Sequence, residues 1–365
     1  MGLTRALNPS AVEWSDVMVT MNDVSKHAGV SVATVSNVIT GKKPVSEDRR
    51  RRVLDSIDAL GYQVNLVARG LKTQRTSIIG LILPDITKLF FQNVIAGIID
   101  AASQNGYRLN ILSSDYHFEN ERSLIDLLRS SRADGIILDS CVPEEQTSNW
   151  LQDLISGGNN STPIVLLENT FQSDRISSVT VDNACYSGMV TQHLLGIGRR
   201  RILYLAGPLH LEHEKARLIG YKMCLERNRI PRDPALEKMC SFMSESGYHA
   251  VVEALGDGIR FDAVQASNDQ AAIGALKALK EYGLRVPEDT AVTGFDNLFP
   301  STLVTPALTT IDIPNYDMGV QAVNVLIGQM NNPGSAPKQV KLDASLVVRA
   351  STCPNVQTDW NLNGW

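Results

Sequence analysis

TMNDVSKHAGVSVATVSNVITG, residues 20–41, is the stretch that decides how the chain begins. Thr20 and Asp23 have the three-residue spacing of a capping box, which predicts the start of a helix. Gly29 stands where that helix would stop, because glycine adopts the left-handed conformation of a helix end without steric cost. Ser31 can cap a second helix. Helix, short glycine turn and helix make a helix-turn-helix unit, whose second helix enters the DNA major groove.

A third helix is predicted to follow this unit. Ser46 can cap it, and two acidic residues stand in its first turn, where the helix dipole favours them. Four arginines in a row lie on the same helix, and some of them are expected to face phosphates. Gly61 would end the helix, and its apolar face is predicted to contain Val53, Leu54, Ile57 and Leu60.

The charge of the chain is divided unevenly. The net charge is -5, but residues 18–77 contain 10 Lys/Arg and 5 Asp/Glu and so carry +5. Residues 1–17 carry -1, which leaves -9 for residues 78–365. A small basic head on a large acidic body is the asymmetry expected when only the head touches phosphates.

Length and composition predict a multidomain cytoplasmic protein. A chain of 365 residues is too long for a single core. We expect no membrane span and no signal peptide, because no long apolar run occurs and the first 14 residues lack one altogether. The cysteines are scattered and odd in number, which is typical of a reducing compartment and argues against a disulfide framework and a cysteine zinc site: Cys141, Cys185, Cys224, Cys240 and Cys353.

Both ends of the chain and one internal segment lack a clear pattern of their own. Residues 1–17 are expected to form a disordered extension, or to precede the true start at Met18 or Met21. Residues 65–76, which include NLVARGLK, are predicted to form a hinge helix of barely two turns and a linker, marginal alone in water. The tail 354–365 has no leucine heptad, so we do not expect it to join tetramers through a coiled coil.

From residue 78 onward, apolar strand-like runs alternate with amphipathic helix-length segments. The predicted strands are 78–83, 108–112, 135–138, 163–167, 179–181, 201–206, 262–266 and 290–295. The predicted helices are near 91–104, 119–131, 145–156, 183–196, 214–228, 245–256 and 269–283. This alternation predicts an α/β architecture with parallel sheets, and the number of strands predicts two doubly wound subdomains. Ligands of such sheets bind beyond the carboxyl ends of the strands, here in the cleft between subdomains.

These motifs, taken together and in order, resemble the bacterial transcription regulators of the lactose/galactose repressor family. The resemblance covers residues from about Val19 to about Ser351. In the head it rests on DVSKHAGVSVATVSNVITG, VSEDRRRRV and GYQVNLVARGLK. In the body it rests on IGLILPDITKLFF, DGIIL, VDN, AGPL, KARLIGY, SESGY, ASNDQAAIGALKAL, GLRVPEDTAVTGFDN and TPALTTI.

The resemblance implies a homodimeric repressor with a DNA-binding head, a hinge helix and a core of the periplasmic-binding-protein type. The head would span residues 18–64 and the effector-binding and dimerisation core residues 77–353. Within the core, the N-subdomain would comprise about 77–181 and 314–341, and the C-subdomain about 182–313 and 342–353. The partners would be a near-palindromic double-stranded operator and a small molecule, most often a sugar, sugar acid or sugar phosphate.

Three positions depart from the family pattern. Val64 replaces the proline that usually precedes the hinge helix, which leaves the start of the hinge less rigid. Asn37 replaces a frequent arginine late in the recognition helix, and Gly198 replaces a histidine. The base-reading surface is therefore expected to be particular to this chain.

By resemblance, Val32, Ala33 and Asn37 are the residues that reach base edges. The Asn37 amide can bond N6 and N7 of adenine, and the two apolar side chains can contact thymine methyl groups. Hydroxyl groups nearby are candidates for phosphate contacts, which position the head without reading sequence: Thr20, Ser31, Thr34 and Ser36. The alternative to a base contact is that Asn37 is an ordinary solvent-exposed residue of the helix.

The hinge residues implied by the resemblance are Asn65, Ala68, Arg69, Leu71 and Lys72. Leu71 would wedge into the minor groove at the operator centre, where a pyrimidine–purine step unstacks most easily. The alternative is that the Leu71 side chain packs against the core or against Leu71 of the second protomer. The basic residues beside it make a poor core environment and favour the wedge.

For the effector, the resemblance points to Phe90, Phe91, Asp115, His213, Arg217, Phe242, Asn268, Asp269 and Asp296. Arg217 would supply a fork of donors, the aspartates acceptors and the phenylalanines apolar walls for a polyhydroxylated ligand. Two adjacent aromatics cannot both face one side of a helix, so one of Phe90 and Phe91 is expected to face the cleft. Asp296 could instead be an ordinary turn residue at the end of a strand.

Three rival interpretations remain weaker. HLEHE, residues 210–214, could ligate a metal, but it lacks the histidine spacing of HExxH, and no metal is expected. An α/β metabolic enzyme with an appended DNA-binding head is the main alternative function. The chain has no GxGxxG after a strand, no GxxxxGK[ST] and no GxSxG, so neither catalysis nor a cofactor is expected. A transport binding protein is the third alternative. The lack of a predicted signal peptide and the presence of a basic head both argue against it.

Overall fold

The computed structural model describes two compact units, one within residues 1–74 and the other within residues 75–365. The described residues are 19–41, 43–62, 75–143, 146, 149–150, 153–154, 162–171, 173 and 175–356. Four predictions therefore lie wholly or mostly outside them: the extension 1–17, the hinge residues 65–72, the helix near 145–156 and the tail beyond 356.

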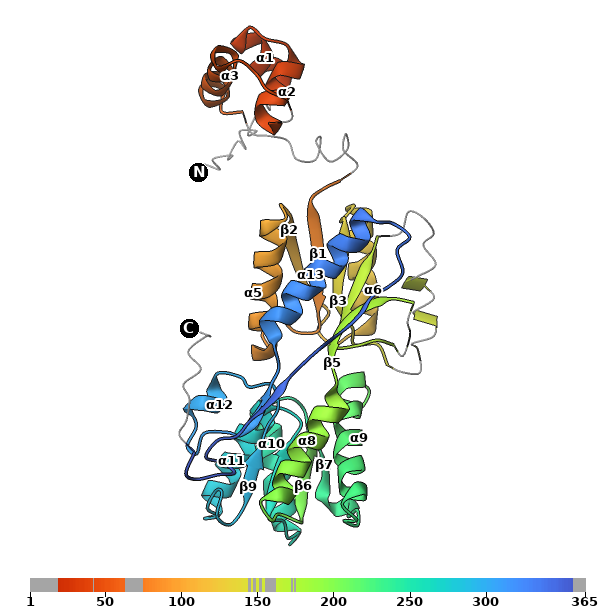
Figure 1. Cartoon of the computed structure of the whole chain (residues 1–365), viewed down its shortest axis with the longest axis vertical. Coiled ribbons are helices and arrows are strands. Elements are labelled where there is room, and N and C mark those ends of the chain that lie inside the picture. Colours follow the sequence, from red (N-terminus) through yellow and green to blue (C-terminus); the bar gives the residue numbers. More distant parts are fainter. Residues whose placement is uncertain are drawn as a thin grey trace, which may run out of the picture. The chain divides into compact units, whose positions relative to one another are not determined.

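The described residues of the smaller unit form the helices α1 (Met21–Ala28), α2 (Val32–Thr40) and α3 (Glu47–Leu60) (Figure 1). The capping box is confirmed, because the Thr20 backbone N–H donates to the Asp23 carboxylate over 2.9 Å and Asp23 N–H donates back to the Thr20 hydroxyl. Gly29 ends α1 with φ 63°. Ser31 caps α2 through its hydroxyl, whereas Ser46 stands at the start of α3 without a side-chain cap bond.

The three helices enclose a small core around Val24, Val35 and Val53, each of which is fully buried. The prediction that Leu54 belongs to the buried face of α3 is wrong, because its side chain is 45% exposed. Ser56 is buried instead: its hydroxyl lies 2.9 Å from His27 Nδ1 of α1 and donates to the Arg52 carbonyl. Successive helix residues differ by about 100° in direction, and in α3 it is Val53 that points into the core.

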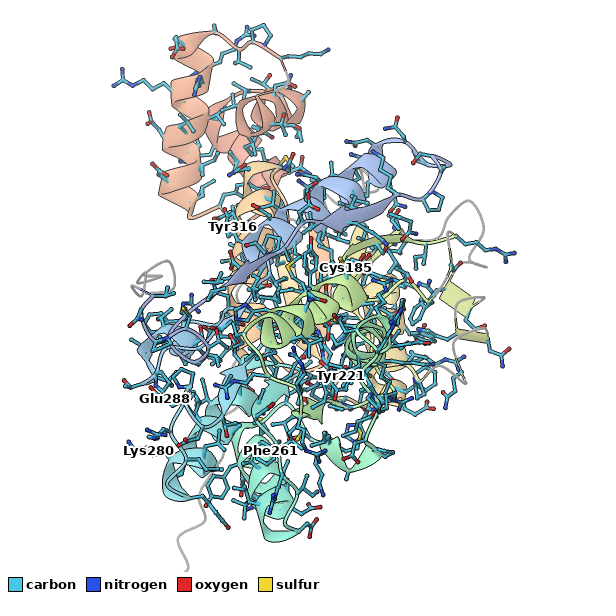
Figure 2. The ribbon with its side chains drawn as sticks, turned by 60° about the horizontal axis from the view of Figure 1, so that its bottom comes forward. Cys185, Tyr221, Phe261, Lys280, Glu288 and Tyr316 are labelled. Carbon is cyan, nitrogen blue, oxygen red and sulfur yellow. The ribbon has the colours of Figure 1, made fainter. Side chains whose placement is uncertain are left out.

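The larger unit begins with a parallel six-stranded sheet of order β11-β5-β4-β3-β1-β2. The strands are β1 (Ile78–Leu83), β2 (Arg108–Ser113), β3 (Gly135–Asp139), β4 (Ile164–Leu167), β5 (Ser177–Val181) and β11 (Gln339–Leu342). Its helices include α5 (Leu89–Gln104), α6 (Phe118–Ser130) and α13 (Asn315–Asn331). Helices α5 and α13 lie side by side on the sheet, and Tyr316 at the start of α13 donates its hydroxyl to Asp100 over 2.8 Å (Figures 1 and 2).

A second parallel sheet has four strands in the order β7-β6-β8-β9. The strands are β6 (Ile202–Ala206), β7 (Glu237–Met239), β8 (Ala263–Ala266) and β9 (Ala291–Thr293). Around it lie α8 (Asn183–Gly196), α9 (Glu212–Arg227), the 3-10 turn η3 (Pro234–Leu236), α10 (Ser244–Gly256), α11 (Asp269–Glu281) and the short α12 (Pro300–Leu303). Two doubly wound sheets are what the alternating pattern predicts.

The chain passes between the two sheets at three places. It leaves the first sheet after β5, returns through β10 (Thr310–Asp312) into α13, and leaves again after β11 into β12 (Ser345–Val347). Strands β10 and β12 pair antiparallel beside the sheets. Of the helices in the described residues, none has the length and apolar character needed to cross a membrane.

Helices α10 and α11 pack closely because glycines stand where their backbones meet. A Cβ added at Gly274 would lie 1.8 Å from the carbonyl oxygen of Ser244, and one at Gly247 would lie 2.2 Å from that of Ala271. Backbone atoms cannot move aside as a flexible side chain can. A side chain at either position must therefore push the two helices apart.

We predict that Gly274→Ala lowers the Tm of the full chain. Alanine favours a helix by about 1 kcal/mol over glycine, but overpacking a close contact costs about 1–3 kcal/mol and here dominates. Gly328→Ala in α13 is the matched control, because a Cβ there meets nothing within 4 Å. Thermal unfolding followed by circular dichroism should show a lower Tm for Gly274→Ala and an equal or higher Tm for Gly328→Ala; the reverse order contradicts the packing argument.

Candidate functional site

The first candidate site is the outward face of α2 in the head. Val32 and Ala33 are exposed at its first turn, and Val32 retains 39% of its surface. Asn37 is partly exposed four residues beyond Ala33, and so on the same helix face. Among the described residues, nothing hydrogen-bonds to the Asn37 amide, which leaves its donor and its acceptor for a base edge. Val35 faces the opposite way, into the core.

The hydroxyls predicted to contact phosphates already make bonds within the head. The Ser31 and Thr34 hydroxyls lie 2.9 Å apart, and Ser31 also caps α2. The Thr20 hydroxyl donates to the Asp23 carboxylate over 2.7 Å. Ser36 is partly exposed on α2. A hydroxyl can accept a second bond or rotate, so these contacts leave room for a phosphate oxygen.

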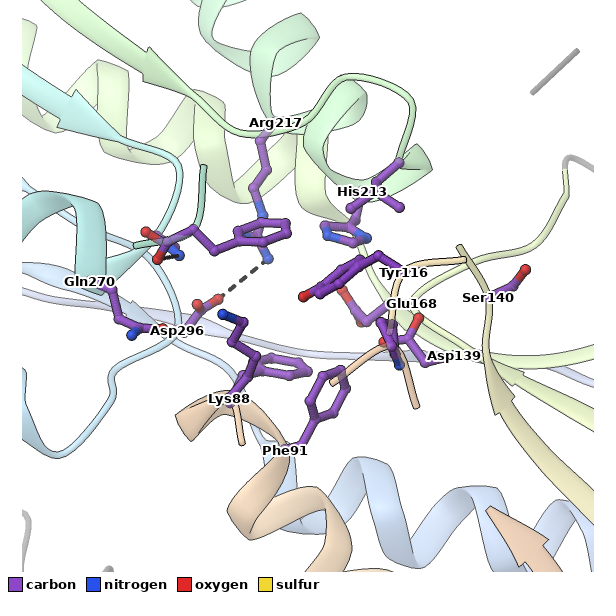
Figure 3. Close-up of a pocket in the computed structure, with 15 residues that line it drawn as sticks. Lys88, Phe91, Tyr116, Asp139, Ser140, Glu168, His213, Arg217, Gln270 and Asp296 are labelled. Carbon is purple, nitrogen blue, oxygen red and sulfur yellow. Dashed lines mark hydrogen bonds and ion pairs between the residues drawn. The ribbon is translucent and has the colours of Figure 1, made fainter. Parts of the chain in front are cut away.

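The second candidate site is a pocket in the larger unit, at the carboxyl ends of both sheets. Its lining residues are Pro84, Lys88, Phe90, Phe91, Tyr116, Asp139, Ser140, Glu168, Leu211, His213, Arg217, Phe242, Asn268, Gln270 and Asp296 (Figure 3). Pro84, Asp139 and Glu168 directly follow or end strands β1, β3 and β4 of the first sheet. Leu211, Asn268 and Asp296 follow strands β6, β8 and β9 of the second. Each wall of the pocket therefore belongs to a different sheet.

Arg217 holds the second-sheet wall together. Its side chain is buried, and Nε donates to Asn183 Oδ1 over 2.8 Å. One terminal nitrogen donates to the Ser267 carbonyl over 2.7 Å and to Glu214 over 3.2 Å. The other faces Asp296 at 3.3 Å, and the guanidinium carbon lies 3.9 Å from the centre of the Phe295 ring. A buried guanidinium requires partners of this kind for its charge and for its several N–H donors.

Two further carboxyls, those of Asp139 and Glu168, line the other wall, and Asn183 connects Glu168 to Arg217 by hydrogen bonds. Burial raises the pKa of Asp139 well above its usual value, and the charges of Glu168 and Glu121 raise it further. Burial also raises the pKa of Glu168, although the positive charge of Arg217 partly opposes this. Burial lowers the pKa of His213 to about 3, with a further contribution from Arg217, so this imidazole is neutral at pH 7. In Figure 3 the side chains of Asp139 and Glu168 lie next to each other beneath Tyr116.

Aromatic rings form the rest of the pocket. The Phe242 ring is roughly parallel to those of Tyr116 and His213, with centroid separations of 6.4 and 6.2 Å. Phe90 and Phe91 meet edge to face at the start of α5, with centroids 5.2 Å apart. Both line the pocket, so the expectation that two adjacent aromatics of one helix cannot face the same side is wrong here: their directions differ by about 100°, and both rings reach the pocket from the first turn of α5. Such apolar faces suit the C–H surfaces of a small ring-shaped ligand.

The structure brings seven of the nine predicted effector residues to this pocket and leaves two outside its lining: Asp115 and Asp269. Asp115 is exposed in a turn with φ 52°, where it accepts a bond from the Ser113 hydroxyl, and its neighbour Tyr116 faces the pocket instead. Asp269 is fully buried and accepts bonds from Leu298 N–H and the Thr310 hydroxyl. It fixes the segment that carries Asp296.

Several lining residues were not predicted from the sequence: Pro84, Lys88, Tyr116, Asp139, Ser140, Glu168, Leu211 and Gln270. A signal for Asp139 and Glu168 was available, because each is the first charged residue after an apolar strand run, at the sheet edge where ligands bind. Lys88 lies before α5, where its amine contacts Asp85 at 3.4 Å and Met243 Sδ at 3.0 Å. Nothing in the sequence pattern linked Lys88 to Met243.

The HLEHE segment does not gather around one point. His210 is exposed, and Glu212 accepts bonds from the Thr170 hydroxyl and from Phe171 N–H. Glu214 pairs with Arg217, and His213 lines the pocket. In the part of the chain that the structure describes, no group of three or more His, Cys, Asp or Glu side chains could hold a metal ion.

Two family profiles match the chain. Residues 20–65 match the "Bacterial regulatory proteins, lacI family", and residues 191–352 match the "Periplasmic binding protein-like domain". The HTH-type transcriptional regulator RegA of Clostridium saccharobutylicum is 33% identical over 91% of this chain and 98% of its own. Catabolite control protein A of Priestia megaterium is 32% identical over 92% of this chain and 99% of its own.

Solved structures agree with the sequence relatives. A lac repressor dimer bound to operator and the anti-inducer ONPF is similar with a TM-score of 0.82 and 27% identity, over 92% of this chain and 99% of that chain. The lac repressor bound to ONPG has a TM-score of 0.83 and 28% identity over the same shares. The predicted fold class and the resemblance are both confirmed. The chain therefore belongs to the lacI family of bacterial regulatory proteins and is a DNA-binding transcription regulator.

Proposed function

We propose that the chain is a cytoplasmic, homodimeric repressor whose affinity for a near-palindromic operator is controlled by a small molecule in the pocket described above. The observation that carries this proposal is that the pocket is lined from both sheets of the larger unit, by Asp139 and Glu168 on one side and Arg217 and Asp296 on the other. A ligand that contacts both walls has different affinity for different angles between them. Differential affinity is what a ligand needs to shift an equilibrium.

The output of this equilibrium is the position of the two heads on the operator. In a dimer, two α2 helices enter successive major grooves, and the spacing between them must match the spacing of the half-sites. A change in the angle between the sheets would alter that spacing and fold or melt residues 65–72. The coupling expected for such a device is about 1–3 kcal/mol per effector.

The effector is expected to be a sugar, a sugar acid or a sugar phosphate. Polar groups at the strand ends, with phenylalanine and tyrosine rings beside them, suit a polyhydroxylated ring. The relatives named above are transcription regulators, and this chain, as a member of their family, is not an enzyme. The alternative of a metabolic enzyme with an appended head is therefore set aside.

We predict that Asn37→Ala weakens binding to the operator by about 1–3 kcal/mol and relaxes the preference at one base pair, because the amide can no longer bond an adenine edge. The operator can be selected from random duplexes with the wild-type protein. Fluorescence anisotropy at fixed salt then gives Kd for the selected site and for random DNA. Ser36→Ala on the same helix is the control, and it should weaken both by a similar factor.

A different pattern would refute the base-reading role of Asn37. If Asn37→Ala loses affinity equally for the selected site and for random DNA, this residue contributes only to general binding. An unchanged base preference in a second selection with the variant would lead to the same conclusion.

We also predict that Arg217→Lys abolishes the effector response while the effector-free protein binds the operator as before. Lysine keeps the charge but loses the fork that joins Asn183, Glu214 and Asp296, so this pocket wall changes shape. A panel of sugars, sugar acids and sugar phosphates is first screened for compounds that change operator affinity of the wild type. Arg285→Lys, at an exposed pair with Asp289, is the matched control. A normal response in Arg217→Lys would mean that the effector binds elsewhere.

A further inference from the structure

The pocket contains two neighbouring carboxyls, Asp139 and Glu168, for which the described residues provide no ion-pair partner within 4 Å, although the charge of Arg217 acts on Glu168 from farther away. Asp139 is the last residue of β3, where it pairs with Leu167 of the parallel strand β4, and Glu168 is the next residue after Leu167. Both side chains belong to residues that are only 5% exposed. Figure 3 shows them side by side on the first-sheet wall, while Arg217 points toward Asp296 on the opposite wall.

Neither carboxyl is satisfied by the protein. Oε1 of Glu168 is buried without a hydrogen-bond partner, whereas Oε2 accepts a bond from Asn183 Nδ2 over 3.2 Å. No backbone or side-chain group of the described residues donates to Asp139. Buried acceptors are nearly always paired, and an unpaired one costs stability. The unpaired Oε1 of Glu168, with the Asp139 carboxyl next to it at the pocket wall, therefore points to a ligand that supplies donors.

The cations of the pocket are already engaged elsewhere. Arg217 directs its donors to Glu214, Asp296, Asn183 and the Ser267 carbonyl. The Lys88 amine lies between Asp85 and Met243 Sδ. His213 is neutral because its pKa is far below 7. A phosphate or carboxylate placed against Asp139 and Glu168 would meet two carboxyls, while the cations that line the pocket contact other partners, which disfavours an anion at this wall.

Resting on the proposed function, we propose that the effector is an amino sugar, whose protonated amine lies between the carboxylates of Asp139 and Glu168. A compact ammonium group has three donors, enough to bond both carboxylates at once. Its charge also compensates for burying them, which a neutral hydroxyl does not. The Tyr116 ring beside the pair adds cation–π attraction, and the phenylalanine rings cover the C–H faces of the sugar.

The test is a thermal-shift and calorimetric panel in which the charge is varied on one sugar, and the neutral sugar and its 2-amino form, which have nearly the same size, are the central comparison. Each series contains one hexose as the neutral sugar, its 2-amino form, its N-acetylated amino form, its aldonic acid and its 6-phosphate, for glucose, galactose and mannose. The full chain is used throughout. We expect the 2-amino member of at least one series to raise the Tm and to bind most tightly, because a ligand specific for the folded state stabilises it. The N-acetylated member, which lacks the charge, should bind far more weakly.

Two isosteric variants connect this preference to the carboxyl pair. Asp139→Asn and Glu168→Gln should each lower the affinity for the amino sugar by at least about thirtyfold, as expected when one partner of a buried charge pair is removed. Their ligand-free Tm should equal or exceed that of the wild type, because each replaces a buried carboxyl that forms no ion pair with the described residues and whose charge is disfavoured mainly by burial. Asp115→Asn is the control: this exposed carboxyl lies next to Tyr116 but outside the pocket lining, so amino-sugar affinity should not change.

The inference is overturned if a neutral sugar, an acid or a phosphate binds most tightly, if no amino sugar in the panel binds, or if both variants keep wild-type affinity for the amino sugar. Operator binding measured with the same preparations separates this failure from failure of the proposed function. A neutral or anionic compound that changes operator affinity would leave the repressor proposal standing and remove only the amine. If the protein binds no DNA site selectively, the proposed function fails irrespective of the ligand.

Discussion

A single buried guanidinium holds the effector pocket in shape. Arg217 joins Asn183 at the start of α8, Glu214 of α9, the Ser267 carbonyl after β8 and Asp296 after β9. A buried charge is tolerated only when it is paired, so these four segments must converge for the second sheet to be stable. The cost of burying the charge is met by partners that also form the pocket wall. The contacts that shape the ligand pocket therefore also contribute to the stability of the second sheet.

Much of the fold could be predicted because its signals are local. The caps at Thr20 and Ser31 and the stop at Gly29 depend on neighbours within a few residues, and strands buried on both faces are continuous apolar runs. The elements that were missed depend on distant partners. β7 and β12 have three residues each, and the apolar pattern of so short a segment does not distinguish a strand from a loop. Helix α13 was also missed, although residues 315–331 have a helical pattern: this region was predicted only as part of the N-subdomain.

The pocket was less predictable than the fold. Arg217 and Asp296 came from family motifs, whereas Asp139 and Glu168 lie outside any motif and were missed. The error at Asp115 is a shift of one residue: a left-handed turn, with φ 52° there and 57° at Tyr116, directs the ring inward and leaves the carboxyl in water. Periodicity cannot predict such a turn, because non-glycine residues rarely adopt it. Asp269 is a buried acceptor that determines where its neighbours lie, a role that sequence alone does not separate from ligand binding.

The order of the strands has a consequence for synthesis on the ribosome. The first sheet begins at β1, but its edge strand β11 lies at residues 339–342 and the helix α13 that covers it at residues 315–331. During translation, the edge of β5 therefore stays unpaired, and the apolar face that α13 covers stays exposed, until roughly a hundred or more further residues, which include the second sheet, have been synthesised. Open edges of this kind pair readily with other chains. The second sheet, which is continuous in sequence from β6 to β9, can fold first, so the nascent chain is expected to need chaperone protection mainly for its earlier half.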